Sequence, residues 1–296
     1  MKLADHAAPF AESWGRELSA GGPDGAMIGR LLVQAGRLTE AEVARALEYG
    51  RRRRVRFGEA AVRLRLVAPE DVVEALCHQF GYPYAARLGG PLGNGELVAA
   101  TNPFGHQAEA FRALRDELIE ALRDEDHRAL AVLSPNVGDG KTYVAANLAV
   151  SFAQLGARTV LVDADMRRPR QHRLFGVDCA VGLSTALAGR SGYVVQAVAE
   201  LPGLHLLPAG PIPPNPLELL RSSAFQSLLD DLLERFDRVL LDTPAGERGA
   251  DGRVVAGAIA ALVIARKHQS IAALQELVES LSRRPVKIAG VMVNEH

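Results

Sequence analysis

The sequence predicts an α/β protein with a mostly parallel, helix-covered sheet, preceded by a small, mainly α-helical repeat domain. Two observations predict this fold. From residue 106 to residue 296, short apolar runs of high β propensity alternate with segments of helical periodicity. Residues 27–79 instead repeat themselves with a shift of 29 residues, and each copy contains only helix-like segments.

Composition, net charge and cysteine positions limit the classes of protein to which this chain can belong. The 296 residues are 48% hydrophobic and 23% charged, which is typical of a globular protein of about two domains. The net charge of −1 gives no support for binding a nucleic-acid polymer. Cys77 and Cys179 lie far apart and outside any CxxC pattern, which favours reduced thiols. The longest apolar run, residues 254–265, is too short to span a bilayer, and residues 1–26 lack the features of a secretory signal.

We expect four segments along the chain. They are a flexible leader over residues 1–26, a helical two-repeat module over 27–84, a linker over 85–105 and a nucleotide-binding domain over 106–296. Within the last segment we expect strands at 129–133, 159–163, 203–209, 238–242, 260–265 and 287–294, with one continuous helix over 217–236.

The repeat has a start signal for the second helix of each copy. Thr39 to Glu42 form a capping box, and Pro69 followed by two acids begins the matching helix. The two copies can bury their apolar faces against each other. We expect Tyr82-Pro83-Tyr84 to close this module by packing its rings on the repeat core.

The stretch Ser134 to Thr142 links an apolar run to a helical segment. Strand, small-residue loop, Gly-Lys-Thr and helix are the context of a phosphate-binding P-loop. Pro135 stands where the plain pattern has glycine, so the later amides must form the cradle. The alternative is a glycine-rich turn without a ligand. The residues expected to bind the phosphates are Val137, Gly138, Asp139, Gly140, Lys141, Thr142 and Tyr143.

Carboxylates follow two of the expected strands. Asp163 and Asp165 end one strand and project the same way, and Asp242 ends another in a Walker B arrangement. Beside Lys141, such carboxylates can hold Mg²⁺ through water, and one can take a proton from a hydroxyl. The alternative is a polar strand end neutralised by Arg167 or Arg168.

A helix over residues 106–123 carries Glu109, Arg112 and Arg115 on one face. The spacing is compatible with ion pairs within a solvated helix, each worth only tenths of a kcal/mol. It is also compatible with an assembly interface, which is the interpretation we favour.

Together these motifs resemble the kinase domain of the bacterial tyrosine kinases that govern exopolysaccharide chain length, which are P-loop NTPases. The resemblance implies ATP- and Mg²⁺-dependent phosphorylation of protein tyrosine. It implies ring-shaped homo-oligomers formed through Glu109, Arg112 and Arg115. It also implies a cytoplasmic location, with a membrane chain-length determinant protein as the partner that brings the chain to the inner face of the plasma membrane.

The same resemblance assigns roles to the site residues. Lys141 and Thr142 bind phosphate and Mg²⁺, Asp163 is the candidate base, and Asp165 and Asp242 support the metal. Asn294 contacts the base or ribose of the nucleotide. The family phosphorylates a tyrosine-rich tail, so here we expect an acceptor on a partner or among Tyr49, Tyr82, Tyr84, Tyr143 and Tyr193.

The repeat module resembles the small N-terminal domain of type II secretion and pilus ATPases, some of which bind cyclic di-GMP. Arg56, Gly58 and Gln79 match that binding motif, whereas Arg65 stands where glycine belongs. A basic run at residues 51–54 is compatible with this ligand or with docking of an acidic partner.

Three alternatives remain beside the kinase. One is a nucleotide-gated assembly scaffold without significant phosphotransfer, and a second is an ATPase controlled by cyclic di-GMP through the repeat module. The third is a partitioning or division-site ATPase, which the resemblance makes less favourable because Asn136 stands where that class has a further lysine.

Overall fold

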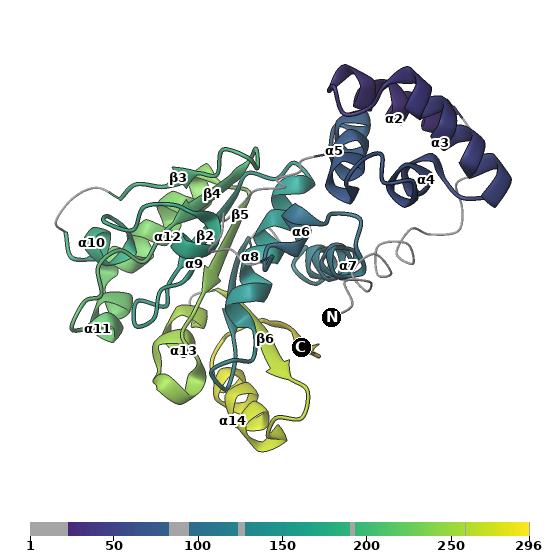
Figure 1. Ribbon diagram of the computed structural model, residues 1–296. Coiled ribbons are helices and arrows are strands. Elements are labelled where there is room, and N and C mark those ends of the chain that lie inside the picture. Colours follow the sequence, from purple (N-terminus) through teal and green to yellow (C-terminus); the bar gives the residue numbers. More distant parts are fainter. Residues whose placement is uncertain (1–22, 83–94, 124–127, 190–192, 258, 296) are drawn as a thin grey trace, which may run out of the picture.

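The computed structural model describes residues 23–82, 95–123, 128–189, 193–257 and 259–295 (Figure 1). A seven-stranded sheet in the order β3-β4-β2-β5-β1-β6-β7 organises the larger part. The strands are β1 Ala129–Leu133, β2 Thr159–Asp163, β3 Gln196–Ala197, β4 Leu204–Leu207, β5 Arg238–Asp242, β6 Ala260–Arg266 and β7 Ile288–Asn294. Every paired neighbour is parallel except the short β3, which runs antiparallel to β4.

Helices cover both faces of the sheet because each strand alternates its side chains between two cores. Leu130 and Val132 face one core, while Ala131 and Leu133 face the other. The first core is covered by α6 Val98–Thr101, α7 His106–Ala121, α8 Lys141–Gln154 and α9 Gln171–Phe175. The second is covered by α10 Leu183–Leu187, α11 Pro216–Arg221, α12 Ser223–Arg235, α13 Asp251–Ala256 and α14 Ile271–Ser282. The predicted mostly parallel, helix-covered sheet is confirmed.

The continuous helix expected over residues 217–236 is wrong. Ser222 has extended backbone angles, φ −71° and ψ 155°, and it separates α11 from α12. The break lets Leu220 and Phe225 both enter the second core. Periodicity alone did not show it, because both helices keep apolar residues at helical spacing.

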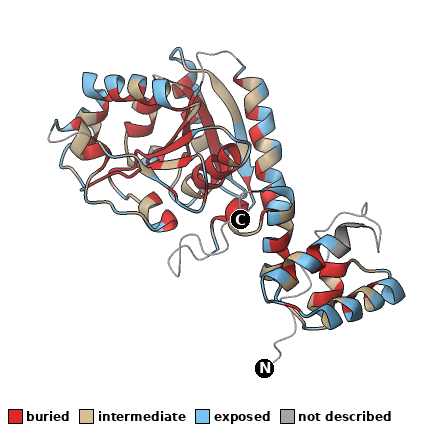
Figure 2. Ribbon diagram, turned by 90° about the horizontal axis from the view of Figure 1, so that it is seen from above, coloured by how far each residue is buried: buried red, intermediate tan, exposed pale blue. Residues whose placement is uncertain are grey.

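In the described residues 23–82, the N-terminal module contains α2 Pro23–Gln34, α3 Glu40–Arg53, α4 Phe57–Arg63 and α5 Pro69–Phe80. Its core is separate from the two cores of the sheet (Figure 2). The predicted capping box is present, since the Glu42 carboxylate accepts from the Thr39 N–H at 2.8 Å and the Glu42 N–H donates to the Thr39 hydroxyl at 3.3 Å.

The repeat is also visible in the backbone. Gly36 and Arg65, which are 29 residues apart, both adopt the left-handed conformation, with φ 67° and φ 55°. Helix α2 begins within the segment expected as a leader, and Leu97, Ala99 and Ala100 of the expected linker are buried in the first core of the sheet. The rest of that leader and residues 85–94 of that linker lie outside the described residues.

Candidate functional site

The loop between β1 and α8 has the predicted P-loop course. Gly138 and Gly140 have φ of 87° and 98°, which side chains other than glycine rarely adopt. At Gly140 space is limiting as well, because an added Cβ would lie 2.2 Å from the Asn294 Nδ2. The same Nδ2 donates to the Asp139 carbonyl at 3.1 Å. The end of β7 therefore fixes the loop by contacting its backbone directly.

Two acidic side chains lie side by side at the carboxyl ends of β2 and β5. Asp163 and Asp242 are paired in register, and both are almost fully buried. The Asp163 Oδ2 accepts from the backbone N–H groups of Arg170 and Gln171 at 2.9 and 3.0 Å. The Oδ1 of each aspartate is buried without a hydrogen-bond partner. Such orphaned acceptors are rare in protein interiors and are compatible with a polar ligand or ordered water.

Burial also changes how these acids titrate. Burial raises the pKa of Asp242 to about 6, against opposing effects of the Lys141 charge and a hydrogen bond from Thr142. Burial, together with the charge of Asp242, raises the pKa of Asp163 well above its ordinary value. The structure thus brings Lys141, Thr142, Asp163 and Asp242 together, as the sequence predicts.

Asp165 lies beside them and is held by the backbone. Its Oδ1 accepts from the N–H groups of Arg167 and Arg168 at 3.2 and 2.9 Å. The Arg167 guanidinium pairs with Asp251 through two hydrogen bonds of 3.1 and 3.2 Å. Arg167 is therefore engaged elsewhere and does not neutralise the carboxylates of Asp163 and Asp242.

A cavity of about 570 Å³ opens over the P-loop. Asp165, Asn294 and the P-loop from Val137 to Tyr143 contribute to its lining, with Asp139 excepted. Four arginines also line it: Arg168, Arg170, Arg248 and Arg266. Arg170 is paired with Glu96, which also lines the cavity, and the Val137 N–H donates to the Glu247 carboxylate at 3.2 Å. The arginines around the glycine-containing loop still favour a polyphosphate.

The residues of the site could hold Mg²⁺ only together with a bound phosphate compound, whose oxygens would complete the set of metal ligands. Among the residues that the structure describes, no group of three or more His, Cys, Asp or Glu side chains could hold a metal ion. Mg²⁺ commonly keeps several waters and takes its remaining ligands from one or two carboxylates and from phosphate oxygens. The orphaned oxygens of Asp163 and Asp242 and the Thr142 hydroxyl are suited to such a shell.

Sequence reasoning missed Gln171. This fully buried side chain donates from its Nε2 to the Thr142 carbonyl at 3.1 Å and to the Asp242 Oδ2 at 2.9 Å. It joins the P-loop helix to the Walker B acid. The only sequence indication is Pro169 shortly after the Asp163 strand, which favours a turn that returns a short helix to the strand end.

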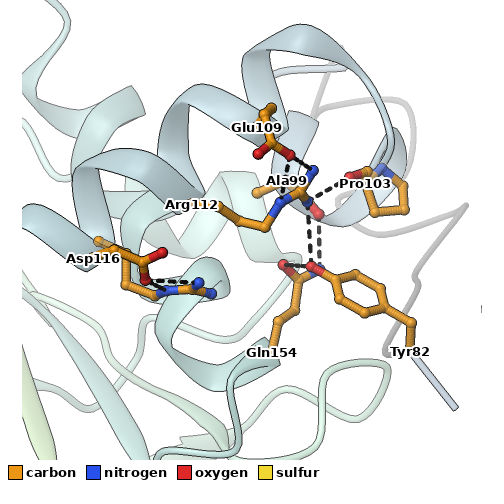
Figure 3. A network of polar contacts seen from close by, with 8 residues as sticks. Tyr82, Ala99, Pro103, Glu109, Arg112, Asp116 and Gln154 are labelled. Atoms are coloured by element: carbon orange, nitrogen blue, oxygen red, sulfur yellow. Dashed lines mark hydrogen bonds and ion pairs between the residues drawn. The ribbon is translucent and has the colours of Figure 1, made fainter. Parts of the chain in front are cut away.

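The three residues of the expected assembly face have different environments, and Figure 3 shows two of them, Glu109 and Arg112. Arg112 forms an ion pair with Glu109, as the intrahelical interpretation predicts. Arg115 is 7% exposed, and its Nη1 donates to the Ser151 carbonyl at 3.1 Å. Arg115 therefore joins α7 to α8, whereas Glu109 remains largely exposed.

Within the described residues, no helix is long and apolar enough to cross a bilayer.

Comparisons with known proteins add independent information. The family model for the cellulose biosynthesis protein BcsQ matches residues 129–279. The chain is 31% identical over 203 residues to the putative tyrosine-protein kinase CapB of Staphylococcus aureus, covering 67% of this chain and 89% of CapB. It is 34% identical over 204 residues to the tyrosine-protein kinase YwqD of Bacillus subtilis, covering 67% and 85%. The solved structure of the chimerical protein CapA2B2 matches with a TM-score of 0.63 and 30% identity, over 75% of this chain and 98% of that one.

Proposed function

Because this chain belongs to the family of bacterial tyrosine-protein kinases, we propose that it is itself an ATP- and Mg²⁺-dependent protein-tyrosine kinase. One observation carries the proposal. Lys141, Thr142 and the paired acids Asp163 and Asp242 converge beside a cavity lined by arginines. This is the donor set that phosphoryl transfer from a nucleotide requires.

Each residue has a role in the proposed reaction. The P-loop N–H groups and Lys141 bind the β- and γ-phosphates, and Asn294 keeps the loop closed. Thr142 and, through water, Asp165 and Asp242 would hold Mg²⁺, which would neutralise charge on the phosphates. Asp163 is the candidate base, because its raised pKa lets it accept a proton from a tyrosine hydroxyl near neutral pH.

We place this kinase in exopolysaccharide production. The matching family model describes a cellulose biosynthesis protein, which supports a role in making a polysaccharide. The likeness to a chimerical protein, CapA2B2, supports pairing with a second polypeptide. In this proposal the partner is a membrane chain-length determinant that recruits the chain to the cytoplasmic face of the membrane. Rings form through the α7 face that contains Glu109 and Arg112.

The test is phosphotyrosine formation by the purified chain. We expect incubation with Mg-ATP and a tyrosine-containing copolymer to yield phosphotyrosine, detected by mass spectrometry. Lys141→Met removes the charge that stabilises the transferring phosphate and should lower the rate by about 10²–10³-fold. Lys267→Met is the matched control, because Lys267 is half exposed and pairs with Glu295. Absence of phosphotyrosine in the unmodified chain, with ATP-dependent assembly intact, would instead indicate a scaffold.

A further inference from the structure

Tyr82 lies between the N-terminal module and the α/β unit. It follows Gly81, the left-handed C-cap of α5. Its hydroxyl donates to the Gln154 Oε1 at 3.0 Å and accepts from the Arg112 Nη1 at 3.4 Å (Figure 3). Its ring lies 6.0 Å from that of Phe104. The expectation that this ring packs on the repeat core is therefore wrong, and Pro83 and Tyr84 lie outside the described residues.

Arg112 is the central group of this contact. Besides Tyr82, its guanidinium donates to the Glu109 carboxylate and, at 2.6 Å, to the Pro103 carbonyl. A guanidinium offers several N–H donors in one plane and pairs more strongly with a phosphate than with a neutral hydroxyl. A phosphoryl group on the Tyr82 hydroxyl would therefore find its cation already in place.

We propose that Tyr82 is a phosphorylation site of this kinase and that its phosphoryl group takes Arg112 from Glu109. The proposal rests on the proposed tyrosine kinase activity. The Tyr82 oxygen forms a bond to the γ-phosphorus of ATP, the bond from that phosphorus to the β-phosphate oxygen breaks, and ADP leaves. The phenolic proton passes to the candidate base Asp163 of the catalysing copy.

The reaction occurs between copies of the chain. Gln154 ends α8, whereas Lys141 begins it. At 1.5 Å per residue these two ends of the 14-residue helix are roughly 20 Å apart. Because Tyr82 contacts the Gln154 end, its hydroxyl lies far from the phosphate-binding end of its own chain.

Phosphorylation changes the contact in a definite direction. The modified Tyr82 oxygen has no proton to donate to Gln154, and phosphate oxygens repel both the Gln154 Oε1 and the Glu109 carboxylate. Only Arg112 gains. The modification therefore weakens the link between the module and α8 while changing the partner of an arginine on the α7 face.

Other described tyrosines are less suited. Tyr49 packs against the core of the module. The Tyr143 ring contacts Phe111 at 5.6 Å, and burial raises the pKa of its hydroxyl. Tyr193 resembles Tyr82 because its hydroxyl accepts from Arg235 at 2.9 Å, but both residues belong to the α/β unit and no second module is involved. Tyr193 is therefore a suitable control.

The full chain is incubated with Mg-ATP, digested and mapped by fragmentation that separates Tyr82 from Tyr84. We expect phosphate on Tyr82, and we expect Tyr82→Phe to lose it while phosphorylation of a tyrosine copolymer continues. Tyr193→Phe should leave the Tyr82 phosphate unchanged. Phosphotyrosine in the copolymer with none on Tyr82 would overturn this inference alone. Phosphotyrosine in neither would overturn the kinase proposal and this inference with it.

Phosphorus NMR tests the pairing with Arg112. In the phosphorylated chain, the second ionisation of the phosphate should occur about half to one pH unit lower than in the phosphorylated Arg112→Gln variant, because the guanidinium stabilises the dianion. Arg112→Lys should give an intermediate value. Equal midpoints in all three proteins would show that the phosphoryl group does not pair with Arg112.

Discussion

At the scale of the residue, the buried acids of the site lower the stability of the folded chain at neutral pH. The pKa of Asp242 rises from its ordinary 3.8 to about 6, so the folded chain holds this proton more tightly than the unfolded chain. Its contribution to stability is therefore greatest below pH 4 and is lost as the pH rises through 6. Asp242→Asn should increase the free energy of unfolding at pH 7.5 by up to roughly 3 kcal/mol, and the gain should disappear near pH 4. Urea denaturation across this pH range measures it.

Asp237 provides a control, because its pKa is lowered whereas that of Asp242 is raised. Hydrogen bonds from Arg158 lower the pKa of this exposed carboxyl. Its stabilising effect is present above its ordinary pKa and is lost as the pH falls through the lowered value. Asp237→Asn should therefore destabilise the chain at neutral pH, and this loss should shrink in acid. If both asparagine variants changed stability in the same direction, burial would not be what raises the pKa of Asp242.

At the scale of the element, α7 combines two kinds of arginine. Arg115 is 7% exposed and donates to a backbone carbonyl of α8, whereas the side chain of Glu109 is 70% exposed. Removing Arg115 leaves a buried acceptor unpaired, so Arg115→Ala should lower the free energy of unfolding by about 1–3 kcal/mol. Glu109→Ala should change it by less than about 0.5 kcal/mol. Denaturation of the two variants under conditions that keep the chain monomeric would show the difference, and equal losses would contradict it.

The left-handed turn at Arg65 is a second element-scale feature. Arg65 has φ 55°, whereas the matching position of the first copy is a glycine. Relief of the left-handed conformation favours glycine by about 1–2 kcal/mol, and the greater freedom of the unfolded chain offsets about half of this. Arg65→Gly should therefore slow amide hydrogen exchange in α3 and α5 several-fold. Arg63→Gly, at the last residue of α4, removes the ion pair with Glu59 and should speed exchange. Faster exchange in both variants would show that Arg65 is not strained.

The sequence predicted elements better than the contacts between them. The apolar runs that became β1 and β5 were found at their true ends, because their apolar residues are buried and each run stops at a loop or an acid. The contacts of Gln171, Asn294 and Tyr82 were not predictable, because each joins segments that are far apart in the chain. A local sequence pattern does not show which oxygen of a distant segment will accept a hydrogen bond from a side-chain amide or hydroxyl. The P-loop and its acids lie close together as expected, whereas the side chains that support them were not identified from the sequence.

At the scale of the whole molecule, the protein has separate cores. One lies within the four helices of the N-terminal module, and two lie on the faces of the sheet. The two cores of the sheet share its strands and should unfold together, whereas the module has a core of its own. The module and the sheet unit should therefore unfold independently unless the contact between them is large. The Tyr82 hydroxyl supplies two of the polar contacts between the parts. We therefore expect two transitions in calorimetry of the full chain.

A nucleotide should act on one transition only. Mg-ATP at 100 times its dissociation constant stabilises the unit that binds it by about 2.7 kcal/mol, provided that the unfolded chain does not bind it. Because the P-loop and its acids belong to the sheet, the transition of the α/β unit should move up by several degrees while that of the module stays in place. Lys141→Met should abolish the movement, and Tyr82→Phe should preserve it. A single transition that moves as a whole would mean that the two parts unfold together, and the Tyr82 contact would then be only one part of a larger interface.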